Sequence, residues 1–182
     1  MFARTERLLL RPGWREDATA LHAAICDERI LRNLAEAPWP YSPDDAERFL
    51  MRERAAGDVT CLILLRTDGA PLLVGAVDFG RKPGAAAPEL GYWIARPYWG
   101  QGIATEAARA LIAAARDSLR YERLVAGHFV DNPASGRVLA KLGFRPTGQV
   151  RGRYSVGRSA IAPCREFALE LNAARETAAM AA

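Results

Sequence analysis

The stretch Gly100-Gln101-Gly102-Ile103-Ala104 has the composition and spacing of an anion-binding turn. Glycine and alanine at alternate positions would let a ligand approach the backbone closely. Apolar residues recur at helical spacing directly afterwards, so a helix is predicted to begin near Gly102, with a buried stripe of Ile103, Ala107, Ala110, Leu111 and Ala114. The first N–H groups of a helix have no partner within it, and the helix dipole attracts negative charge there. The stretch therefore predicts a phosphate site.

Two common phosphate-binding motifs do not fit this turn. A Walker loop needs the tripeptide Gly-Lys-Ser/Thr, which the sequence lacks. A dinucleotide fingerprint needs a third small residue where Thr105 stands, and an acidic residue that closes the next strand. Glu122 is the nearest candidate, and it precedes its strand. The turn therefore belongs to a different kind of phosphate site.

A second helix with a polar start is predicted after Asp131. Asn132 suits the N-cap position, Pro133 suits the first helical position, and Gly143 suits the C-terminal stop. The buried stripe of this helix would be Val138, Leu139 and Leu142. Residues 136–142 contain no tyrosine, so Ser135 in the first turn is the nearest hydroxyl group.

Together the two stretches resemble the GNAT N-acetyltransferase superfamily. The segment from Trp99 to Ala104 is similar to its acetyl-coenzyme A signature, Gln/Arg-x-x-Gly-x-Gly/Ala. Trp99 departs from the commonest form, and an aromatic residue there resembles the RimJ/RimL-type branch, which acetylates ribosomal-protein N-termini. The asparagine-capped helix that ends in Leu142, Gly143 and Phe144 resembles a second superfamily signature. The resemblance covers nearly the whole chain, up to Leu171.

The hydrophobic pattern predicts one mixed α/β domain over residues 1–172 and a frayed, alanine-rich tail over 173–182. About seven strands are expected, at 7–11, 59–65, 72–79, 89–95, 124–130, 144–153 and 164–171, and the strand at 124–130 is expected to be buried on both faces. Helices are expected to begin near residues 16, 28, 42, 102 and 132. The resemblance implies that the fourth and fifth strands splay apart and that the pantetheine arm lies between them.

The resemblance implies acetyl-coenzyme A as the acetyl donor, held by backbone N–H groups of residues 100–104. It adds backbone contacts from Trp93, Ile94 and Ala95, and a contact from Asn132, which can also be purely a helix cap. Trp99 would either cover the cofactor turn or cap the sheet. Three arginines could meet the ribose phosphate or simply be surface residues, namely Arg96, Arg137 and Arg145.

Ser135 and Glu89 are the candidate catalytic residues. In the RimJ/RimL-type branch a serine at this place is thought to assist the departing sulfur, and the alternative is an ordinary serine of a first helical turn. A glutamate in the region of Glu89 serves as the general base in several family members, whereas a strand-start glutamate can also simply face solvent. Asp78, near the end of the third strand, is a weaker candidate for the base.

The loop between the first two helices lines the acceptor cleft in the family. Trp39 and Tyr41, flanked by prolines, are therefore the candidate acceptor-binding residues, and the alternative is that they pack in the core. A protein α-amine has a pKa of about 7.7–8.0 and lysine one of about 10.4, so the α-amine is much easier to deprotonate at pH 7. Because the candidate base chemistry is sparse, the α-amine is the favoured acceptor.

Composition limits the other possibilities. The chain has 182 residues, a formal net charge of +4, and no run of about 20 apolar residues that could span a membrane. Three isolated cysteines without a CxxC pair favour a reduced, cytoplasmic protein. The two histidines are not clustered with cysteines, so no metal site is expected. No long basic run points to nucleic acid.

These features predict an acetyl-coenzyme A-dependent N-acetyltransferase that acts by direct transfer on the α-amine of a protein or peptide. Two alternatives stay open. One is an acetyltransferase for a small amine such as a polyamine, an amino acid or an aminoglycoside. The other is an acyl-coenzyme A-binding module without catalysis. The protein is expected to be a monomer or a homodimer.

Overall fold

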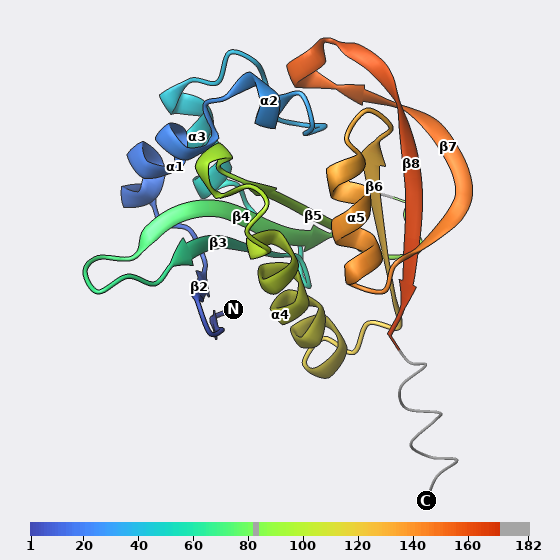
Figure 1. Ribbon diagram of the computed structural model, residues 1–182, viewed down its shortest axis with the longest axis horizontal. Coiled ribbons are helices and arrows are strands. Elements are labelled where there is room, and N and C mark those ends of the chain that lie inside the picture. The colour runs from blue at the N-terminus through green and yellow to red at the C-terminus, as the bar shows by residue number, and fades with distance from the viewer. Residues whose placement is uncertain (82–83, 172–182) are drawn as a thin grey trace, which may run out of the picture.

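A single twisted sheet organises the chain (Figure 1). The structure is a computed structural model that describes residues 1–81 and 84–171, so the predicted tail at 173–182 lies outside the described residues. Eight strands follow the order β1-β2-β3-β4-β5-β6-β8-β7. Their bounds are β1 Ala3–Arg4, β2 Leu8–Arg11, β3 Val59–Leu65, β4 Leu72–Gly80, β5 Glu89–Ile94, β6 Arg123–Phe129, β7 Arg145–Ser155 and β8 Ala160–Glu170.

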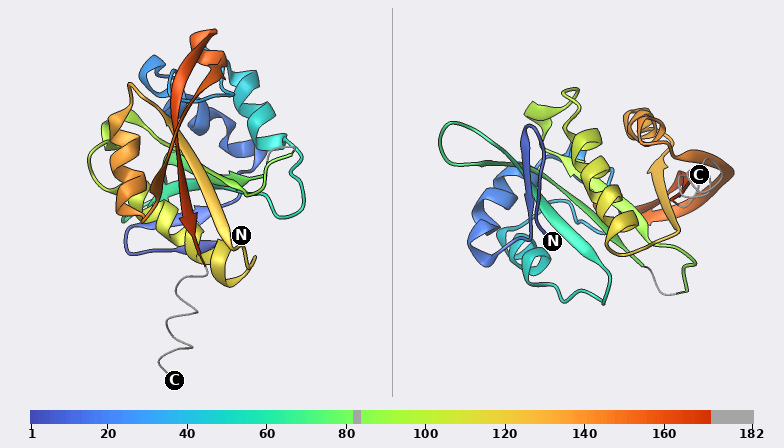
Figure 2. Two further views of the ribbon diagram at one scale, coloured as in Figure 1. Left: turned by 90° about the vertical axis from the view of Figure 1, so that its right-hand side faces the viewer. Right: turned by 90° about the horizontal axis from the view of Figure 1, so that it is seen from below.

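Helices cover both faces of the sheet, as Figure 2 shows from the side and from below. The α-helices are α1 Ala18–Ile25, α2 Glu28–Leu31, α3 Pro43–Met51, α4 Ile103–Asp117 and α5 Pro133–Lys141, and short 3-10 turns are found at Arg15–Asp17, Arg96–Tyr98 and Val156–Arg158. One core packs Ile103, Leu111 and their neighbours of α4 against the strands. The other core packs α1, α2 and α3 against the opposite face, where Trp93 lies.

The predicted helix caps are confirmed. Ser42 forms a capping box with Asp45 and is followed by Pro43, so α3 begins where the sequence indicates. The side chain of Asn132 accepts a hydrogen bond from the N–H of Ser135 at the start of α5. Gly143 has a φ of +89°, the left-handed conformation that glycine adopts after a helix end. These caps depend only on neighbouring residues, and therefore the sequence predicts them well.

Three expectations need correction. The sheet has an eighth strand because the short β1 pairs with β2. The last strand begins at Ala160, earlier than residue 164. Its first residues pair with the end of β7 directly after the turn of a long hairpin. The strand at β6 is not buried on both faces, since Leu124, Ala126 and Phe129 are buried whereas Val125, Gly127 and His128 are half-buried. The reason is the gap that opens beside β6.

The predicted splay between the fourth and fifth expected strands is confirmed, and these strands are β5 and β6. They run parallel but pair only at Glu89 with Val125 and at Leu90 with Ala126. Beyond Leu90 the strands separate, so the remainder of β5 has an unpaired edge toward β6. On its other side β5 stays paired with β4 as far as Ile94. A rigid strand with one open edge is thus held next to the first turn of α4.

Within the described ranges, no helix is both long enough and apolar enough to cross a membrane.

Candidate active site

The turn before α4 has the geometry of an anion site. Gly100 and Gly102 have φ values of +76° and +78°, which side-chain-bearing residues rarely adopt. Gly102 is the N-cap of α4, and no side chain caps this helix end. The N–H groups of the first helical turn, which begins at Ile103, therefore lack an intrahelical acceptor and point toward the turn. A Cβ at Gly100 would meet no atom within 4 Å, so the backbone there is open to a ligand.

The open edge of β5 supplies a second set of backbone groups, and here one prediction is wrong. The N–H of Ala95 donates to Val74, and its carbonyl accepts from Tyr98, so neither group is available to a ligand. Backbone groups of alternate strand residues point to the same edge, so Trp93 also faces β4. Its carbonyl oxygen lies only 2.3 Å from where a Cβ at Gly75 of β4 would be. The residues whose backbone faces the gap are Tyr92 and Ile94.

Trp99 caps the sheet and borders the turn at the same time. Its indole Nε1 donates to the carbonyl of Ile94 over 2.6 Å, which leaves the Ile94 N–H as the free group of that residue on the open edge. The side chain is 46% exposed and lines the main cavity. Both predicted roles of Trp99 are thus compatible with its position.

Arg7, which sequence reasoning missed, holds the turn from the N-terminal segment. Its Nη1 donates to the carbonyl of Gln101 over 3.0 Å, while its Nε and Nη2 bind Glu106 of α4 at 2.8 and 2.7 Å. Glu106 also accepts from the hydroxyl of Thr5 and from the backbone N–H of Arg7. This network ties the turn to the first turn of α4 and adds a positive charge beside it. Arg7 and Gln101 are 94 residues apart in sequence, so no local signal reveals the contact.

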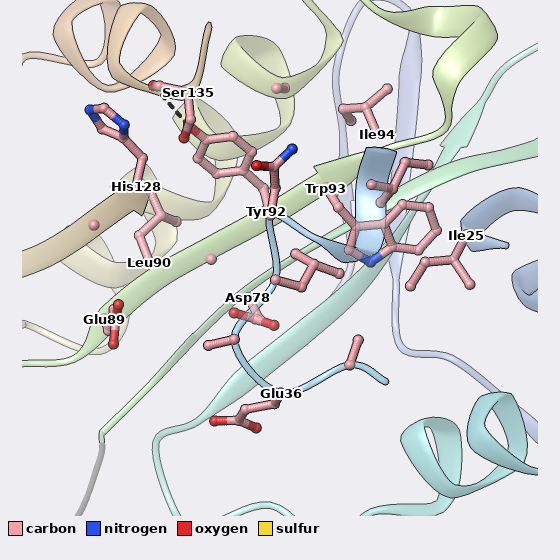
Figure 3. Close-up of a pocket in the computed structure, with 18 of the residues that line it drawn as sticks. Ile25, Glu36, Asp78, Glu89, Leu90, Tyr92, Trp93, Ile94, His128 and Ser135 are labelled. Atoms are coloured by element: carbon pink, nitrogen blue, oxygen red, sulfur yellow. Dashed lines mark hydrogen bonds between the residues drawn. The ribbon is translucent and has the colours of Figure 1, made fainter. Parts of the chain in front are cut away.

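Ser135 faces the gap from the other side and pairs with a residue of β5. Its Oγ lies 2.8 Å from the hydroxyl of Tyr92, which also donates to the Ser135 carbonyl over 3.1 Å (Figure 3). Burial raises the pKa of Tyr92 to about 12, and the hydrogen bond with Ser135 opposes this rise only in part, so Tyr92 stays a neutral donor. Sequence reasoning missed Tyr92, although a hydroxyl among the apolar residues of one strand face, Leu90 and Ile94, was a usable signal.

The carboxylate of Glu89 forms an ion pair with Arg153. Its two carboxylate oxygens accept from Nη1 and Nη2 of Arg153 on β7, at 2.5 and 3.0 Å. The carboxylate is 17% exposed and lines the main cavity. A carboxylate held by a bidentate guanidinium is a weak proton acceptor, because protonation would break charge-assisted hydrogen bonds. The structure therefore gives Glu89 a structural role at the start of the open strand.

The main cavity extends over both sides of β5 and has a volume of about 1560 Å³. On one side it is lined by Gly100, Gly102, Ala104, Asn132 and Ser135, and on the other by Tyr41, Asp78 and Trp93. In Figure 3, Ser135 lies on the same side of this strand as the ring of Tyr92, and Asp78 lies on the other side. A donor on the α4 side and an acceptor on the α1 side could therefore meet at β5.

The two aromatic residues that were predicted to bind the acceptor, Trp39 and Tyr41, differ in their burial. Tyr41 is 6% exposed and packs in the core beneath α1 and α3, and only part of it reaches the cavity wall. Trp39 is 40% exposed and is absent from the described residues that line the cavity. The prediction that Trp39 lines the acceptor cleft is therefore not supported. Of the three arginines proposed for the ribose phosphate, only Arg137 lines the cavity.

The tip of the β7–β8 hairpin is bonded to two parts of the cavity wall. Arg158 at this tip binds both oxygens of Asp131 at 2.8 and 2.9 Å and stacks over Phe129. The N–H of Val156 donates to Ala35, and the hydroxyl of Ser155 donates to Leu34 in the loop between α2 and α3. The hydrogen bonds from Arg158 are the main cause that lowers the pKa of Asp131. Leu34, Ala35 and Asp131 line the cavity, so the hairpin braces its wall on the side of the α2–α3 loop.

No cluster of three or more histidine, cysteine or acidic side chains that could hold a metal ion is found among the described residues.

The comparisons with known proteins agree with this geometry. The family model described as the acetyltransferase (GNAT) domain matches residues 7–145. The uncharacterized N-acetyltransferase YnaD of Bacillus subtilis (strain 168) is 27% identical over 149 residues, which cover 81% of this chain and 85% of YnaD. The ribosomal-protein-serine acetyltransferase of Escherichia coli (strain K12) is 38% identical over 73 residues, 40% of this chain and 41% of that protein.

Solved structures show the same fold. A GNAT-family acetyltransferase from Bacillus anthracis superimposes with a TM-score of 0.80 at 25% identity, covering 94% of this chain and 99% of that one. RimL, the ribosomal L7/L12 alpha-N-protein acetyltransferase, solved in complex with coenzyme A, gives a TM-score of 0.77 at 20% identity, covering 95% and 99%. The chain therefore belongs to the GNAT N-acetyltransferase family.

Proposed function

We propose that this acetyltransferase moves the acetyl group of acetyl-coenzyme A directly to the α-amine at the N-terminus of a protein or peptide. The observation that carries the proposal is one continuous cavity. It connects the glycine turn of α4, the open edge of β5 and the hydroxyl of Ser135 with a chamber beside Trp93 on the opposite face. Direct transfer needs both substrates at one point, and this cavity offers a place for each.

The residues around the turn fit the acetyl donor. The pyrophosphate would be held by N–H groups of Gly102, Ile103 and Ala104, because these groups lack partners and the two glycines leave the backbone accessible. The pantetheine arm would extend along β5, where Tyr92 and the N–H of Ile94 face the gap. Neighbours in the fold bind coenzyme A or acetyl-coenzyme A, which supports this assignment.

Ser135 would protonate the departing sulfur. The Tyr92 hydroxyl has a single proton, and when it donates that proton to Ser135 Oγ instead of to the Ser135 carbonyl, the proton of Ser135 is free for a third partner in the cavity. Tyr92 would thereby hold the serine in the donating orientation. This division of roles makes Ser135 the candidate general acid and Tyr92 its positioning residue.

A chain terminus suits the acceptor side better than an internal side chain does. The α2–α3 loop lines the chamber and is braced by the β7–β8 hairpin, and a chain terminus can enter a chamber with such a fixed wall end-on. The names of two similar proteins, one acting on ribosomal-protein serine and one on an α-amine, support the same class.

The test is an acetylation assay on peptides with a free N-terminus, with matched peptides whose N-terminus is blocked and which carry one lysine. We expect mass spectrometry to find the acetyl group on the α-amine of the free peptides and no product with the blocked ones. Polyamines, amino acids and aminoglycosides are the comparison panel. Transfer to a small amine without transfer to any peptide would contradict the proposed acceptor, and binding of the donor without any transfer would contradict the enzymatic role.

A further inference from the structure

The carboxylate of Asp78 on β4 occupies the space where a side chain at position 91 of the neighbouring strand β5 would lie. In the sheet it lies between Thr60 of β3 and Gly91 of β5. A Cβ built on Gly91 would be 2.6 Å from Asp78 Oδ1, closer than real Cβ atoms come to other atoms. The absence of a side chain at position 91 therefore lets the Asp78 carboxylate lie over β5. There it lines the main cavity together with Tyr92 and Trp93 (Figure 3).

The bonding of Asp78 differs from that of the carboxylates around it. Glu89 is bound by Arg153, Glu36 by Arg52 at 2.9 Å, and Asp58 accepts from the backbone N–H of Arg81. The backbone of Asp78 is paired in the sheet, but its side chain makes no hydrogen bond or ion pair within residues 1–81 and 84–171. A carboxylate that is partly buried, faces a cavity and has no such partner there retains its lone pairs for a ligand.

The charges that face Asp78 come from three neighbouring segments. Burial has the largest effect and raises the pKa of Asp78 to about 6. Arg54 and Arg52, which follow α3, lower this pKa, while Glu36 of the α2–α3 loop and Glu89 of β5 raise it. At neutral pH the group is then mostly ionised, yet it is a stronger base than an ordinary aspartate with a pKa of about 3.9. This is the range in which a general base is most effective.

We infer that Asp78, rather than Glu89, is the general base that removes a proton from the acceptor ammonium group. This inference rests on the proposed function, since it assumes an amine acceptor in the chamber beside Trp93. It assigns Glu89 and Arg153 to holding β5, and it explains why glycine stands at position 91.

The step balances as follows. The ammonium nitrogen gives one proton to the Asp78 carboxylate, which later releases it to solvent. The lone pair of the neutral nitrogen forms the C–N bond with the thioester carbonyl carbon, and the C–S bond breaks. The sulfur takes the proton of the Ser135 hydroxyl, and the second proton lost by the nitrogen restores that hydroxyl. The products are an amide, a thiol and one proton.

The experiment compares Asp78→Asn with wild type on two acceptors. The first is a peptide with a free N-terminus, and the second is methoxyamine, which is already uncharged at neutral pH. We expect kcat/KM for the peptide to fall by about 100-fold or more, as loss of a general base does, whereas kcat/KM for methoxyamine stays nearly unchanged. Asp68→Asn makes the same chemical change in the exposed β3–β4 turn and is the matched control, expected to behave as wild type.

The pH profile gives a second readout. For wild type, the reactive pair is the ammonium acceptor and the Asp78 carboxylate, so log kcat/KM for the peptide should be nearly level between the Asp78 pKa of about 6 and the amine pKa of about 7.7–8.0, and should fall with slope one below about pH 6. In Asp78→Asn only the neutral amine can react, so log kcat/KM should fall with slope one already below the amine pKa of about 7.7–8.0. Equal losses on both acceptors would indicate a structural role and overturn the inference, as would an unchanged rate or a wild-type profile that falls from the amine pKa as the variant's does.

Failure of the proposed function gives a different result. If wild type acetylates only small amines, the peptide proposal fails, and the same comparison is made between a charged small amine and methoxyamine. If wild type transfers to no amine at all, both proposals are overturned. A wild-type enzyme that is active on peptides and a variant that is equally active would overturn the assignment of Asp78 alone.

Discussion

The hydroxyl of Tyr92 lies 2.8 Å from Oγ of Ser135 and joins β5 to the first turn of α5 across the splayed part of the sheet. Ser135 is in turn fixed by its N–H, which donates to the capping side chain of Asn132. Ser135 is thus positioned by one contact from its own helix cap and by one from β5.

Ser135→Ala is expected to lower kcat by about 100-fold or more, in the range for a lost acid, with little change in the affinity for acetyl-coenzyme A. Tyr92→Phe should give a smaller fall in kcat, because it removes only the orientation of the serine. The double variant should resemble Ser135→Ala alone, since both changes act through one proton. Steady-state kinetics and calorimetry with the donor measure these effects. Additive losses in the double variant would show that Tyr92 acts independently of Ser135.

Gly102→Val is expected to weaken acetyl-coenzyme A binding at least tenfold, or about 1.4 kcal/mol. Gly102 has a φ of +78°, and a branched side chain there would strain the turn and cover its N–H groups. Gly148→Val is the matched control, because Gly148 has a φ of +83° and no atom lies within 4 Å of its Cβ position. Calorimetry on both folded variants measures the difference. Equal affinities would place the donor elsewhere.

Arg158→Ala is expected to raise the acceptor KM several-fold while donor affinity stays nearly unchanged. Arg158 holds the hairpin tip to Asp131 and is 14% exposed, so its loss should loosen the brace on the α2–α3 loop that lines the chamber. A stability loss of about 1–3 kcal/mol is also expected, measurable by chemical denaturation. The control is Arg151→Ala on the same hairpin, whose contact to Glu166 at 3.6 Å is exposed. An unchanged acceptor KM with a lowered stability would limit the hairpin to a structural role.

Asp78→Asn is expected to stabilise the folded protein at pH 8. Burial, the largest cause, raises the pKa of Asp78 from 3.8 to about 6. Because the folded pKa lies above the unfolded one, the contribution of Asp78 to stability is present below pH 4 and is lost as the pH rises through about 6. The asparagine avoids this loss, so the free energy of unfolding should increase at pH 8 by at most about 3 kcal/mol. Unfolding curves at pH 4 and pH 8 test this, and a gain of equal size at both would contradict it.

The amino-acid sequence by itself determined the elements that depend on near neighbours. The glycines at 100 and 102, the caps at Ser42 and Asn132 and the hydrophobic periods of β3, β4 and α4 act within a few residues, so their backbone conformations could be predicted. The resemblance carried by the two motifs also predicted the splay between β5 and β6, which the structure confirms. The cytoplasmic location stays a prediction.

Only the tertiary structure decided which groups at the site are free. The sequence offers Glu89 as a candidate general base, but the strand register brings Arg153 into contact with its carboxylate from 64 residues away. Tyr92 meets Ser135 over a separation of 43 residues, and Ala95 loses its backbone groups to Val74 and Tyr98. Asp78 gains its place only because Gly91 lies opposite it. These relationships depend on sheet register and on the closure of long loops, and local sequence patterns carry no information on either.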